Sequence, residues 1–209
     1  MYKKFLKRCL DLLLSLMVLS ILSPVFLVMI LLGTIFMRGN PFYTQARPGK
    51  DGKIFRLIKF RSMTNRKDAE GKLLPDTQRV TAYGRFIRAA SLDELPEFLN
   101  IFIGNMAFIG PRPLLVEYLP YYTPEEMRRH EVLPGLTGLA QVNGRNGLSW
   151  EERFRLDVQY VDSVSFLLDL KIVFLTVKAV VCRSGVQVDT SKEEGNFAQI
   201  RKEQLQEKR

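Results

Sequence analysis

The chain has 209 residues, and 31 Lys and Arg residues against 22 Asp and Glu residues give it a formal net charge of +9. This length suffices for one core-bearing domain with an appendage, and a hydrophobic fraction of 46% excludes a disordered, collagen-like or polytopic membrane chain. Two cysteines and a single histidine are too few for a disulfide framework, make a zinc site unexpected and indicate a reducing compartment.

The positive charge is concentrated near the N-terminus. Residues 1–67 contain 13 Lys and Arg residues against Asp11 and Asp51, a net charge of +11, so the other 142 residues carry a net charge of −2. Nucleic-acid-binding proteins often have a basic surface that is spread more evenly, and we therefore expect no nucleic-acid partner.

The longest apolar segment runs from Leu12 to Met37 and contains 26 residues without a formal charge. As a straight helix it would measure roughly 39 Å, enough to cross a bilayer core of ~30 Å, and it is too long for the apolar core of a signal peptide. Both flanks are basic, however, and each flank favours the cytoplasmic side. At Ser23 and Pro24, near the middle, proline removes a backbone N–H and the serine hydroxyl can bind a freed carbonyl. These residues favour a re-entrant helix that bends at Ser23-Pro24, with a kinked spanning helix as the alternative.

The body of the chain begins with two β-prone stretches, 41–46 and 53–60, joined by turn residues, and this pattern predicts a hairpin. Its basic residues are expected to face lipid headgroups. Further on, Glu125 and Arg129 stand four residues apart in a charged helical turn, the spacing at which side chains on one helix meet. Apolar residues recur at helical spacing over 150–181, which predicts helices that pack in the core or lie in the membrane plane.

The stretch Ser91-Leu92-Asp93-Glu94-Leu95-Pro96 places two adjacent carboxylates in an apolar frame. One interpretation is a capping box, in which Ser91 is the N-cap, Glu94 is the third residue and Asp93 is only a favourable first-turn acid. The other interpretation is a catalytic pair, and the neighbouring arginines favour it. These arginines are Arg85, Arg88, Arg112 and Arg145.

Arg112 lies between two prolines, which restrict its backbone and limit the entropy lost when its guanidinium binds a phosphate. Carboxylates beside arginines can form a salt-bridge network, or they can hold a divalent cation and a diphosphate together. The segment from Pro134 to Arg145 contains three glycines, which permit a tight loop with exposed backbone N–H groups or a purely structural turn. It has neither a Walker sequence nor a G-x-G-x-x-G pattern, so nucleotide binding by those routes is not supported.

Taken in order, these blocks resemble the bacterial sugar transferases, specifically the small monotopic phosphoglycosyl transferases of the PglC type. The resemblance covers roughly residues 1–185. It rests on Lys7-Arg8-x-x-Asp11, the apolar run with Ser23-Pro24, Tyr43 to Gly49, Lys59 to Met63, Ser91 to Pro96, Gly110 to Pro113, Pro134 to Arg145, and Asp169 to Lys171. The chain departs from the family pattern at Asn105-Met106-Ala107, and at Glu97, where glutamine is usual.

The resemblance implies an α+β fold, mostly helical with a few short strands, a re-entrant membrane helix and in-plane amphipathic helices. It implies an anchor over residues 1–38 and a catalytic domain over 39–185, and we expect a polar, partly ordered tail over 186–209. The implied location is the bacterial inner membrane, with the catalytic domain on the cytoplasmic face.

The implied reaction moves a phosphosugar from a UDP-sugar to polyprenyl (undecaprenyl) phosphate and releases UMP, in the first membrane step of glycoconjugate biosynthesis. An N-acetylated sugar such as diacetylated bacillosamine is favoured, Mg²⁺ is the implied cofactor, membrane lipids are expected partners, and a homo-oligomer is left open. In such enzymes the dyad aspartate, here Asp93, forms a covalent phosphosugar intermediate, and Glu94 is assigned to the metal with Asp93 beside it. The expected substrate-binding residues are Arg88, Arg112, Arg145, Lys59 and Gln141.

Two other functions remain open from the residues. A membrane-attached, metal-dependent phosphohydrolase would use water to resolve the aspartyl intermediate. A basic membrane scaffold or nucleic-acid-binding module built on residues 38–67 would need no carboxylate chemistry.

Overall fold

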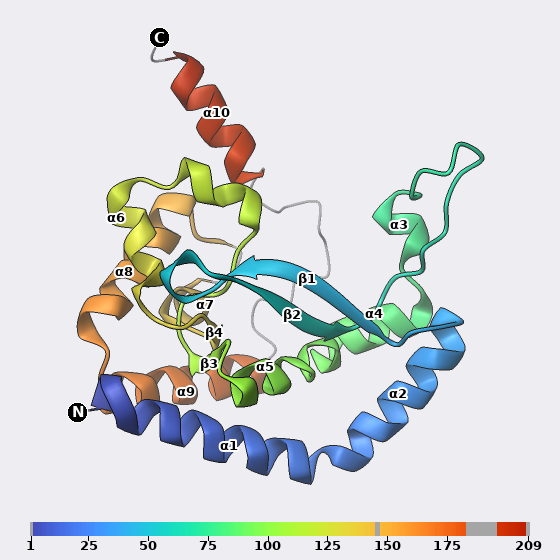
Figure 1. The fold of residues 1–209 in the computed structure, drawn as a ribbon, viewed down its shortest axis with the longest axis horizontal. Coiled ribbons are helices and arrows are strands. Elements are labelled where there is room, and N and C mark those ends of the chain that lie inside the picture. Colours follow the sequence, from blue (N-terminus) through green and yellow to red (C-terminus); the bar gives the residue numbers. More distant parts are fainter. Residues whose placement is uncertain (1, 145–146, 183–195, 208–209) are drawn as a thin grey trace.

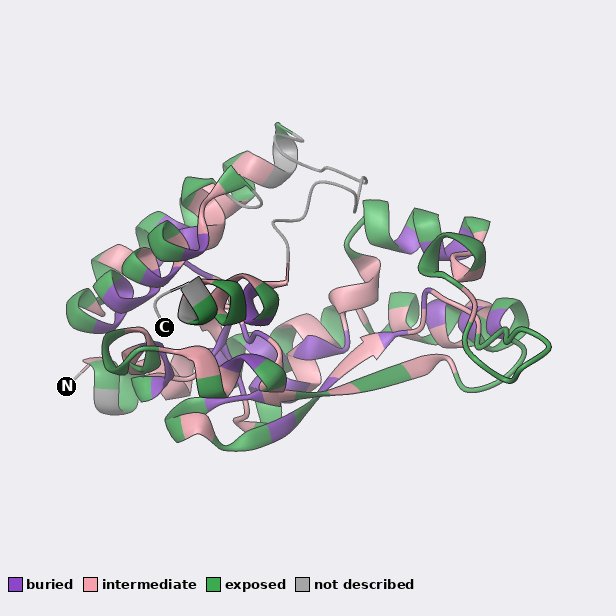
Figure 2. Cartoon of the chain, turned by 90° about the horizontal axis from the view of Figure 1, so that it is seen from above, coloured by how far each residue is buried: buried purple, intermediate pink, exposed green. Residues whose placement is uncertain are grey.

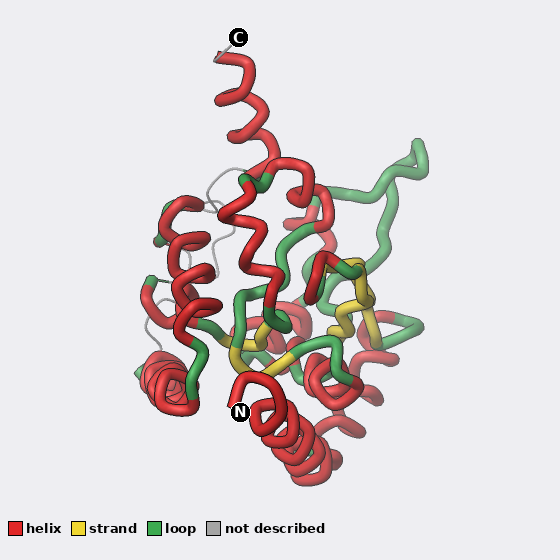
Figure 3. Tube along the Cα trace, turned by 60° about the vertical axis from the view of Figure 1, so that its left-hand side comes forward, coloured by secondary structure: helices red, strands yellow, loops and turns green. Residues whose placement is uncertain are grey.

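The computed structural model describes residues 2–144, 147–182 and 196–207 (Figure 1). In this part of the chain helices dominate and strands are few and short, as expected for an α+β fold (Figure 3). The helices are α1 (Lys7–Ile21), α2 (Ser23–Met37), α3 (Asp76–Arg79), α4 (Ala82–Ala89), α5 (Glu97–Ile103), α6 (Pro124–Met127), α7 (Leu139–Asn143), α8 (Trp150–Ser163), α9 (Phe166–Val181) and α10 (Phe197–Glu207). The strands are β1 (Phe42–Pro48), β2 (Ile54–Phe60), β3 (Ala107–Ile109) and β4 (Gly135–Thr137).

The N-terminal apolar segment is broken where the sequence predicts a break. Helices α1 and α2 meet at an angle of 64°, with Pro24 in the first turn of α2. The Ser23 hydroxyl donates a hydrogen bond of 2.8 Å to the carbonyl of Ser20 in the last turn of α1. Within the described residues no single helix is long and apolar enough to cross a membrane. Helices α1 and α2 reach the necessary length and apolar composition only when they are taken together as a bent pair.

Helix α1 is attached to the rest of the protein by polar contacts from its first turns. Arg8 donates to the carbonyls of Ile101 and Phe102, which lie in the last turn of α5, at 2.6 and 2.8 Å. The buried carboxylate of Asp11 accepts a hydrogen bond from the backbone N–H of Phe108 in β3, and Lys7 forms an ion pair of 2.7 Å with Asp169 in α9. The Lys7-Arg8-x-x-Asp11 block therefore connects α1 to three separate elements.

Helix α2 contributes directly to the core. Met29 and Met37 are buried against Phe60 at the end of β2 and against Tyr83 and Ile87 of α4. Figure 2 shows the same division along the chain, with buried residues on the inner faces of the helices and exposed residues on their outer faces.

The predicted hairpin is confirmed. Strands β1 and β2 pair in antiparallel register from Phe42 opposite Phe60 to Pro48 opposite Ile54. Helix α5 is attached to this hairpin by the buried side chain of Asn100, whose amide accepts from the N–H of Ile58 and donates to the carbonyl of Arg56. This contact holds the middle of α5 against β2, and an ion pair of 3.0 Å between Lys59 and Glu97 joins the end of β2 to the start of α5.

The glycine-rich segment after Pro134 serves close packing. Strands β3 and β4 form a parallel pair, and a Cβ on Gly135 would stand 2.1 Å from the backbone nitrogen of Gly110. A Cβ on Gly138 would stand 2.2 Å from the Gly110 carbonyl oxygen, so both positions require glycine. The Gly135 N–H donates to the carbonyl of Pro111 and is not free for a phosphate. Close backbone packing therefore accounts for both glycines, and at Gly135 the structural turn is the correct interpretation.

The C-terminal helix α10 joins the aromatic core of the body, a contact that the composition of the tail does not predict. Phe197 is 1% exposed and contacts Tyr118, Trp150 and Phe154. In the next turn Arg201 forms an ion pair of 2.6 Å with Glu126 of α6, and the end of α10 extends away from the body (Figure 1).

Arg129 does not pair with Glu125, the partner at helical spacing. It lies buried and forms a 2.7 Å ion pair with Asp157 of α8, while its neighbour Arg128 pairs with Glu125. The adjacent His130 is also buried, with Nδ1 3.2 Å from the carbonyl oxygen of Gly49. Burial and the charge of Arg129 lower the pKa of His130 to about 4.

We predict that His130 makes the protein less stable in acid. Because its pKa is about 4 in the folded state and ordinarily about 6.5, the unfolded chain takes up the proton first as the pH falls. The free energy of unfolding should therefore decrease by up to about 3 kcal/mol between pH 6.5 and 4 and be unaffected by this group above that window. Melting temperatures of wild type and His130→Gln measured from pH 7.5 to 4 test this. Equal acid dependence in the two proteins would contradict it.

Candidate active site

The site begins where α4 packs on the end of the hairpin. The Thr81 side chain caps α4 by accepting from the N–H of Gly84. A Cβ on Gly84 would stand 1.8 Å from the carbonyl oxygen of Ser62, so glycine is needed for this contact. One turn later, Arg88 Nε donates a 2.8 Å hydrogen bond to the buried hydroxyl of Ser62, which fixes the direction of an otherwise exposed arginine.

Asp93 and Glu94 lie on a 3₁₀ turn, Leu92–Glu94, that connects α4 to α5. The residue before the turn, Ser91, has a left-handed backbone with φ of 53° and makes no side-chain capping bond. The capping-box interpretation of Ser91 and Glu94 is therefore wrong, because an N-cap residue has an extended backbone and its hydroxyl accepts from the first turn.

Glu94 is the centre of an ion cluster, made of Lys59, Glu94, Glu97 and Arg112. Oε1 of Glu94 lies 2.8 Å from Lys59 Nζ and 2.7 Å from Arg112 Nη2, and Lys59 Nζ lies 3.0 Å from Glu97 Oε1. The side chains become less exposed inward, from 42% for Arg112 to 25% for Glu94, 20% for Lys59 and 2% for Glu97. The cluster thus runs from the surface to the core.

The surroundings separate the acidities of the three carboxylates. Burial alone would raise the pKa of Glu94, but Arg112 and Lys59 outweigh it and lower that pKa to about 2. Burial raises the pKa of Glu97, with a further contribution from Glu94, against the opposing effect of Lys59. Burial and the Glu94 charge likewise raise the pKa of Asp93, opposed by Lys59 and Arg88.

Asp93 differs from Glu94 in its contacts. Within the described residues, no side chain donates a hydrogen bond to the Asp93 carboxylate, whereas both Lys59 and Arg112 donate to Glu94. A half-buried carboxylate that is surrounded by cations yet held by none of them can react with an electrophile. Glu94 is immobilised and charged, and suits a supporting role.

Arg112 is positioned from both ends. Its backbone lies between Pro111 and Pro113, and its carbonyl accepts a 2.8 Å hydrogen bond from Arg129, the arginine that pairs with Asp157. Its guanidinium is held by Glu94, whose charge raises the pKa of Arg112. This arginine is therefore always charged and has its other N–H groups available for a ligand.

Arg47 is an additional candidate that the sequence analysis does not single out as a site residue. It donates to Gln45 at 2.7 Å and to the carbonyl of Pro113 at 3.4 Å, and its buried Nε has no hydrogen-bond partner in residues 2–144, 147–182 and 196–207. Burial and the nearby charge of Arg112 lower the pKa of Arg47. In the sequence, Arg47 could be noticed only as a member of the Tyr43 to Gly49 block of the family pattern. The structure adds that this part of β1 contacts the segment that contains Arg112.

Gln141, an expected site residue, is not part of the ion cluster. The Gln141 amide donates to the carbonyl of Leu136, and its Oε1 is buried without a hydrogen-bond partner among the described residues. Arg145 lies outside the described residues. Of the expected substrate-binding residues, Lys59 and Arg112 contact the dyad directly, and Arg88 lies near enough to Asp93 to influence its pKa.

Comparison with known proteins gives a consistent result. Residues 2–183 match the family model for bacterial sugar transferases. The chain is 50% identical over 182 residues to the uncharacterized sugar transferase EpsL of Bacillus subtilis, covering 87% of this chain and 90% of that protein. It is 37% identical over 196 residues to the exopolysaccharide production protein ExoY of Sinorhizobium fredii, covering 86% of this chain and 87% of that protein.

A third relative is much longer than this chain. The UDP-glucose:undecaprenyl-phosphate glucose-1-phosphate transferase of Klebsiella pneumoniae is 41% identical over 182 residues, which cover 82% of this chain but only 39% of that protein. The match over residues 2–183 includes the hairpin, the turn Leu92–Glu94 with its two carboxylates (the carboxylate turn) and the segment around Arg112. The chain belongs to the bacterial sugar transferase family.

Proposed function

We propose that this protein is a phosphoglycosyl transferase that moves a sugar phosphate from a UDP-sugar to polyprenyl phosphate and releases UMP. The observation that carries the proposal is the contrast between two adjacent carboxylates. Lys59 and Arg112 hold Glu94, whereas no side chain among the described residues donates a hydrogen bond to Asp93. Relatives named for this reaction class support it, including the Klebsiella pneumoniae enzyme and the undecaprenyl-phosphate galactose phosphotransferase of Salmonella typhimurium, which is 37% identical over 200 residues. This chain spans less than half of each of those two proteins.

The proposed reaction has two steps at one carboxylate. In the first, an oxygen of Asp93 attacks the phosphorus that bears the sugar, the bond to the bridging oxygen breaks, and UMP leaves. In the second, a phosphate oxygen of the polyprenyl phosphate attacks the same phosphorus, the bond to Asp93 breaks, and the lipid diphosphate sugar is released. One nucleophile thereby serves two bulky substrates in turn, which predicts ping-pong kinetics.

The surrounding cations supply electrostatic stabilisation. The transferring phosphoryl group carries negative charge on its outer oxygens, and fixed positive groups lower the energy of that state. Arg112 and Lys59 are fixed by Glu94, and Arg88 is fixed by Ser62. Arg47 donates to the carbonyl of Pro113, the residue that follows Arg112, and we propose that the two guanidinium groups bind neighbouring phosphates.

Mg²⁺ fits the carboxylate turn as a shared ion between protein and substrate. Across the described ranges, no three His, Cys, Asp or Glu side chains come together as a metal site. Mg²⁺, however, is commonly held by one or two carboxylates together with phosphate oxygens and water. Asp93 and Oε2 of Glu94, which has no hydrogen-bond partner among the described residues, would hold it, and when bound it would neutralise diphosphate charge.

The fold also supports placement at a membrane. The outer faces of α1 and α9 expose large apolar side chains, among them Leu13 and Met17 of α1 and Leu167 and Phe174 of α9. Both helices lie at the same side of the molecule in Figure 1, and the Lys7–Asp169 ion pair joins them. We propose that this side rests on the cytoplasmic face of the bacterial inner membrane, with α1 and α2 as a re-entrant anchor.

The sugar is the open part of the proposal. The resemblance to the PglC type favours an N-acetylated amino sugar, whereas relatives named for glucose and galactose favour a hexose without an acetamido group. UMP release measured across UDP-diacetylbacillosamine, UDP-GlcNAc, UDP-GalNAc, UDP-galactose and UDP-glucose would identify the donor.

We predict that Asp93→Asn abolishes UMP release and the labelled covalent adduct formed from a UDP-sugar, because the amide is not a nucleophile. Asp51→Asn is the matched control, since Asp51 is exposed in the hairpin loop with φ of 56°, a conformation that asparagine also tolerates. Normal turnover by Asp93→Asn would disprove the assignment. Steady UMP release by the wild type without polyprenyl phosphate would instead favour the phosphohydrolase.

Arg47→Gln should lower kcat/KM for the UDP-sugar by about 10- to 100-fold, the effect of losing one charge-assisted contact to a phosphate. Arg56→Gln, at an exposed position of β2, should change kcat/KM little. Melting temperatures of both variants are needed to separate binding from stability. An unchanged kcat/KM in a folded Arg47→Gln protein would exclude Arg47 from substrate binding.

The membrane topology can be measured by cysteine labelling after Cys9 and Cys182 are replaced by serine. Single cysteines at Lys3 and Asn40 should react with a membrane-impermeant reagent from the same side of sealed vesicles. A cysteine at Val25, beside the bend, should stay unlabelled. Labelling of positions 3 and 40 from opposite sides would show a spanning helix.

A further inference from the structure

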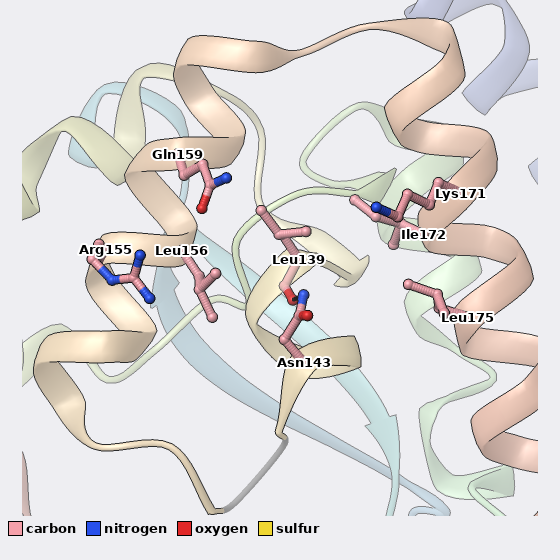
Figure 4. A pocket seen from close by; sticks show the side chains of 8 residues that line it. All are labelled: Leu139, Asn143, Arg155, Leu156, Gln159, Lys171, Ile172 and Leu175. Atoms are coloured by element: carbon pink, nitrogen blue, oxygen red, sulfur yellow. Dashed lines mark hydrogen bonds between the residues drawn. The ribbon is translucent and has the colours of Figure 1, made fainter.

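A cavity of about 260 Å³ lies between α7, α8 and α9, and none of the residues of the candidate active site lines it. Its lining combines aliphatic side chains with cationic and amide groups (Figure 4). The lining residues are Leu139, Asn143, Arg155, Leu156, Gln159, Lys171, Ile172 and Leu175. This volume is slightly below the range of about 300–1,000 Å³ typical of small-molecule sites, so the cavity suits a headgroup better than a whole ligand.

Two cations face this cavity from opposite walls. In Figure 4, Arg155 extends from α8 and Lys171 extends from α9, with Leu139 of α7 between them. Neither cation has a carboxylate oxygen within 4.0 Å among the described residues, unlike Arg128 and Arg129 nearby, which are paired with acids. The amide of Gln159, one turn after Arg155, points to the same space and adds a hydrogen-bond donor.

The position of Lys171 connects the cavity to the exposed apolar face of α9. Lys171 directly follows Leu170 and lies one helical turn from Leu167 and Phe174, and these three side chains are 54%, 76% and 69% exposed. On the inner side, Ile172 is fully buried. Lys171 therefore stands at the border between the cavity and the face that we place on the membrane, where a long cationic side chain can reach a headgroup.

We propose that this cavity binds the headgroup phosphate of an anionic membrane phospholipid, between Arg155 and Lys171, while the acyl chains of that lipid lie along the apolar face of α9. The proposal rests on the membrane placement given under the proposed function. The lipid bound in this cavity would be a different molecule from the acceptor lipid. The cavity lies between α7, α8 and α9, whereas the proposed nucleophile, Asp93, lies on the turn between α4 and α5. Such a lipid would fix the depth at which α9 rests.

The first test measures binding to vesicles of phosphatidylcholine with and without phosphatidylglycerol. Wild type should bind the phosphatidylglycerol vesicles about tenfold more tightly than does Arg155→Gln/Lys171→Gln. The control is Arg38→Gln/Lys178→Gln, which removes the same charge from exposed positions beside the same proposed membrane surface. Equal losses in the two double variants would mean diffuse electrostatic attraction and would overturn the proposal.

The second test uses detergent solution, where no bilayer is needed. A short-chain phosphatidylglycerol should raise the melting temperature of wild type and of the control variant but not that of Arg155→Gln/Lys171→Gln. Inorganic phosphate and glycerol phosphate should have no such effect, because they lack the apolar part. Equal stabilisation by the soluble phosphates would identify a soluble anion as the occupant and overturn the lipid assignment.

These measurements separate the two proposals from each other. UMP release by Arg155→Gln/Lys171→Gln in detergent should equal that of wild type, since neither residue contacts the carboxylate turn. Failure of wild type to bind any vesicle would refute the membrane placement, while the detergent titration would still decide whether the cavity binds the lipid. If short-chain phosphatidylglycerol did not raise the melting temperature of wild type, the lipid site would be refuted. The transferase proposal would be unaffected.

Discussion

The candidate active site depends on one carboxylate oxygen, Oε1 of Glu94, which is shared by Lys59 and Arg112. A charge at this depth is costly unless it is paired, and leaving one partner alone costs more than removing both. Lys59 comes from a strand, Glu94 from a short turn and Arg112 from a loop, so the pairing requires all three segments to be in place together. Formation of the site is thereby linked to completion of the fold, and Asp93 is left as the carboxylate that accepts no side-chain hydrogen bond in the part of the chain that the structure describes.

Local patterns predicted the elements better than the contacts between them. The hairpin and the break at Ser23-Pro24 follow from turn residues and from proline chemistry, which act within a few residues. The pairing of Arg129 with Asp157 joins positions 28 residues apart, and helical spacing pointed instead to Glu125. The left-handed backbone of Ser91 could not be predicted either, because the sequence from Ser91 to Glu94 matches a capping box.

The same limit applies to the site. The dyad and the arginines stood out as unusual residues and as blocks of a known family, so most site candidates could be named from the sequence. The family resemblance also implied roles for the dyad and the arginines. The ion pairs of Lys59 with Glu94 and Glu97 were not predictable from the sequence, because they join separate elements. The contact of Arg47 with the carbonyl of Pro113 was not predictable for the same reason. The glycines near Gly135 illustrate the reverse case, since a pattern that also suits phosphate binding serves close backbone packing.

The burial of Met29 and Met37 against Phe60, Tyr83 and Ile87 has a practical consequence. A soluble catalytic fragment made by deleting residues 1–38 would lose part of its hydrophobic core and would leave the partners of those methionines facing water. A fragment made for expression should therefore retain α2, and the detergent should leave the contacts of Met29 and Met37 with the core intact. Exchanging this segment with that of another protein would require redesign of the core around Phe60.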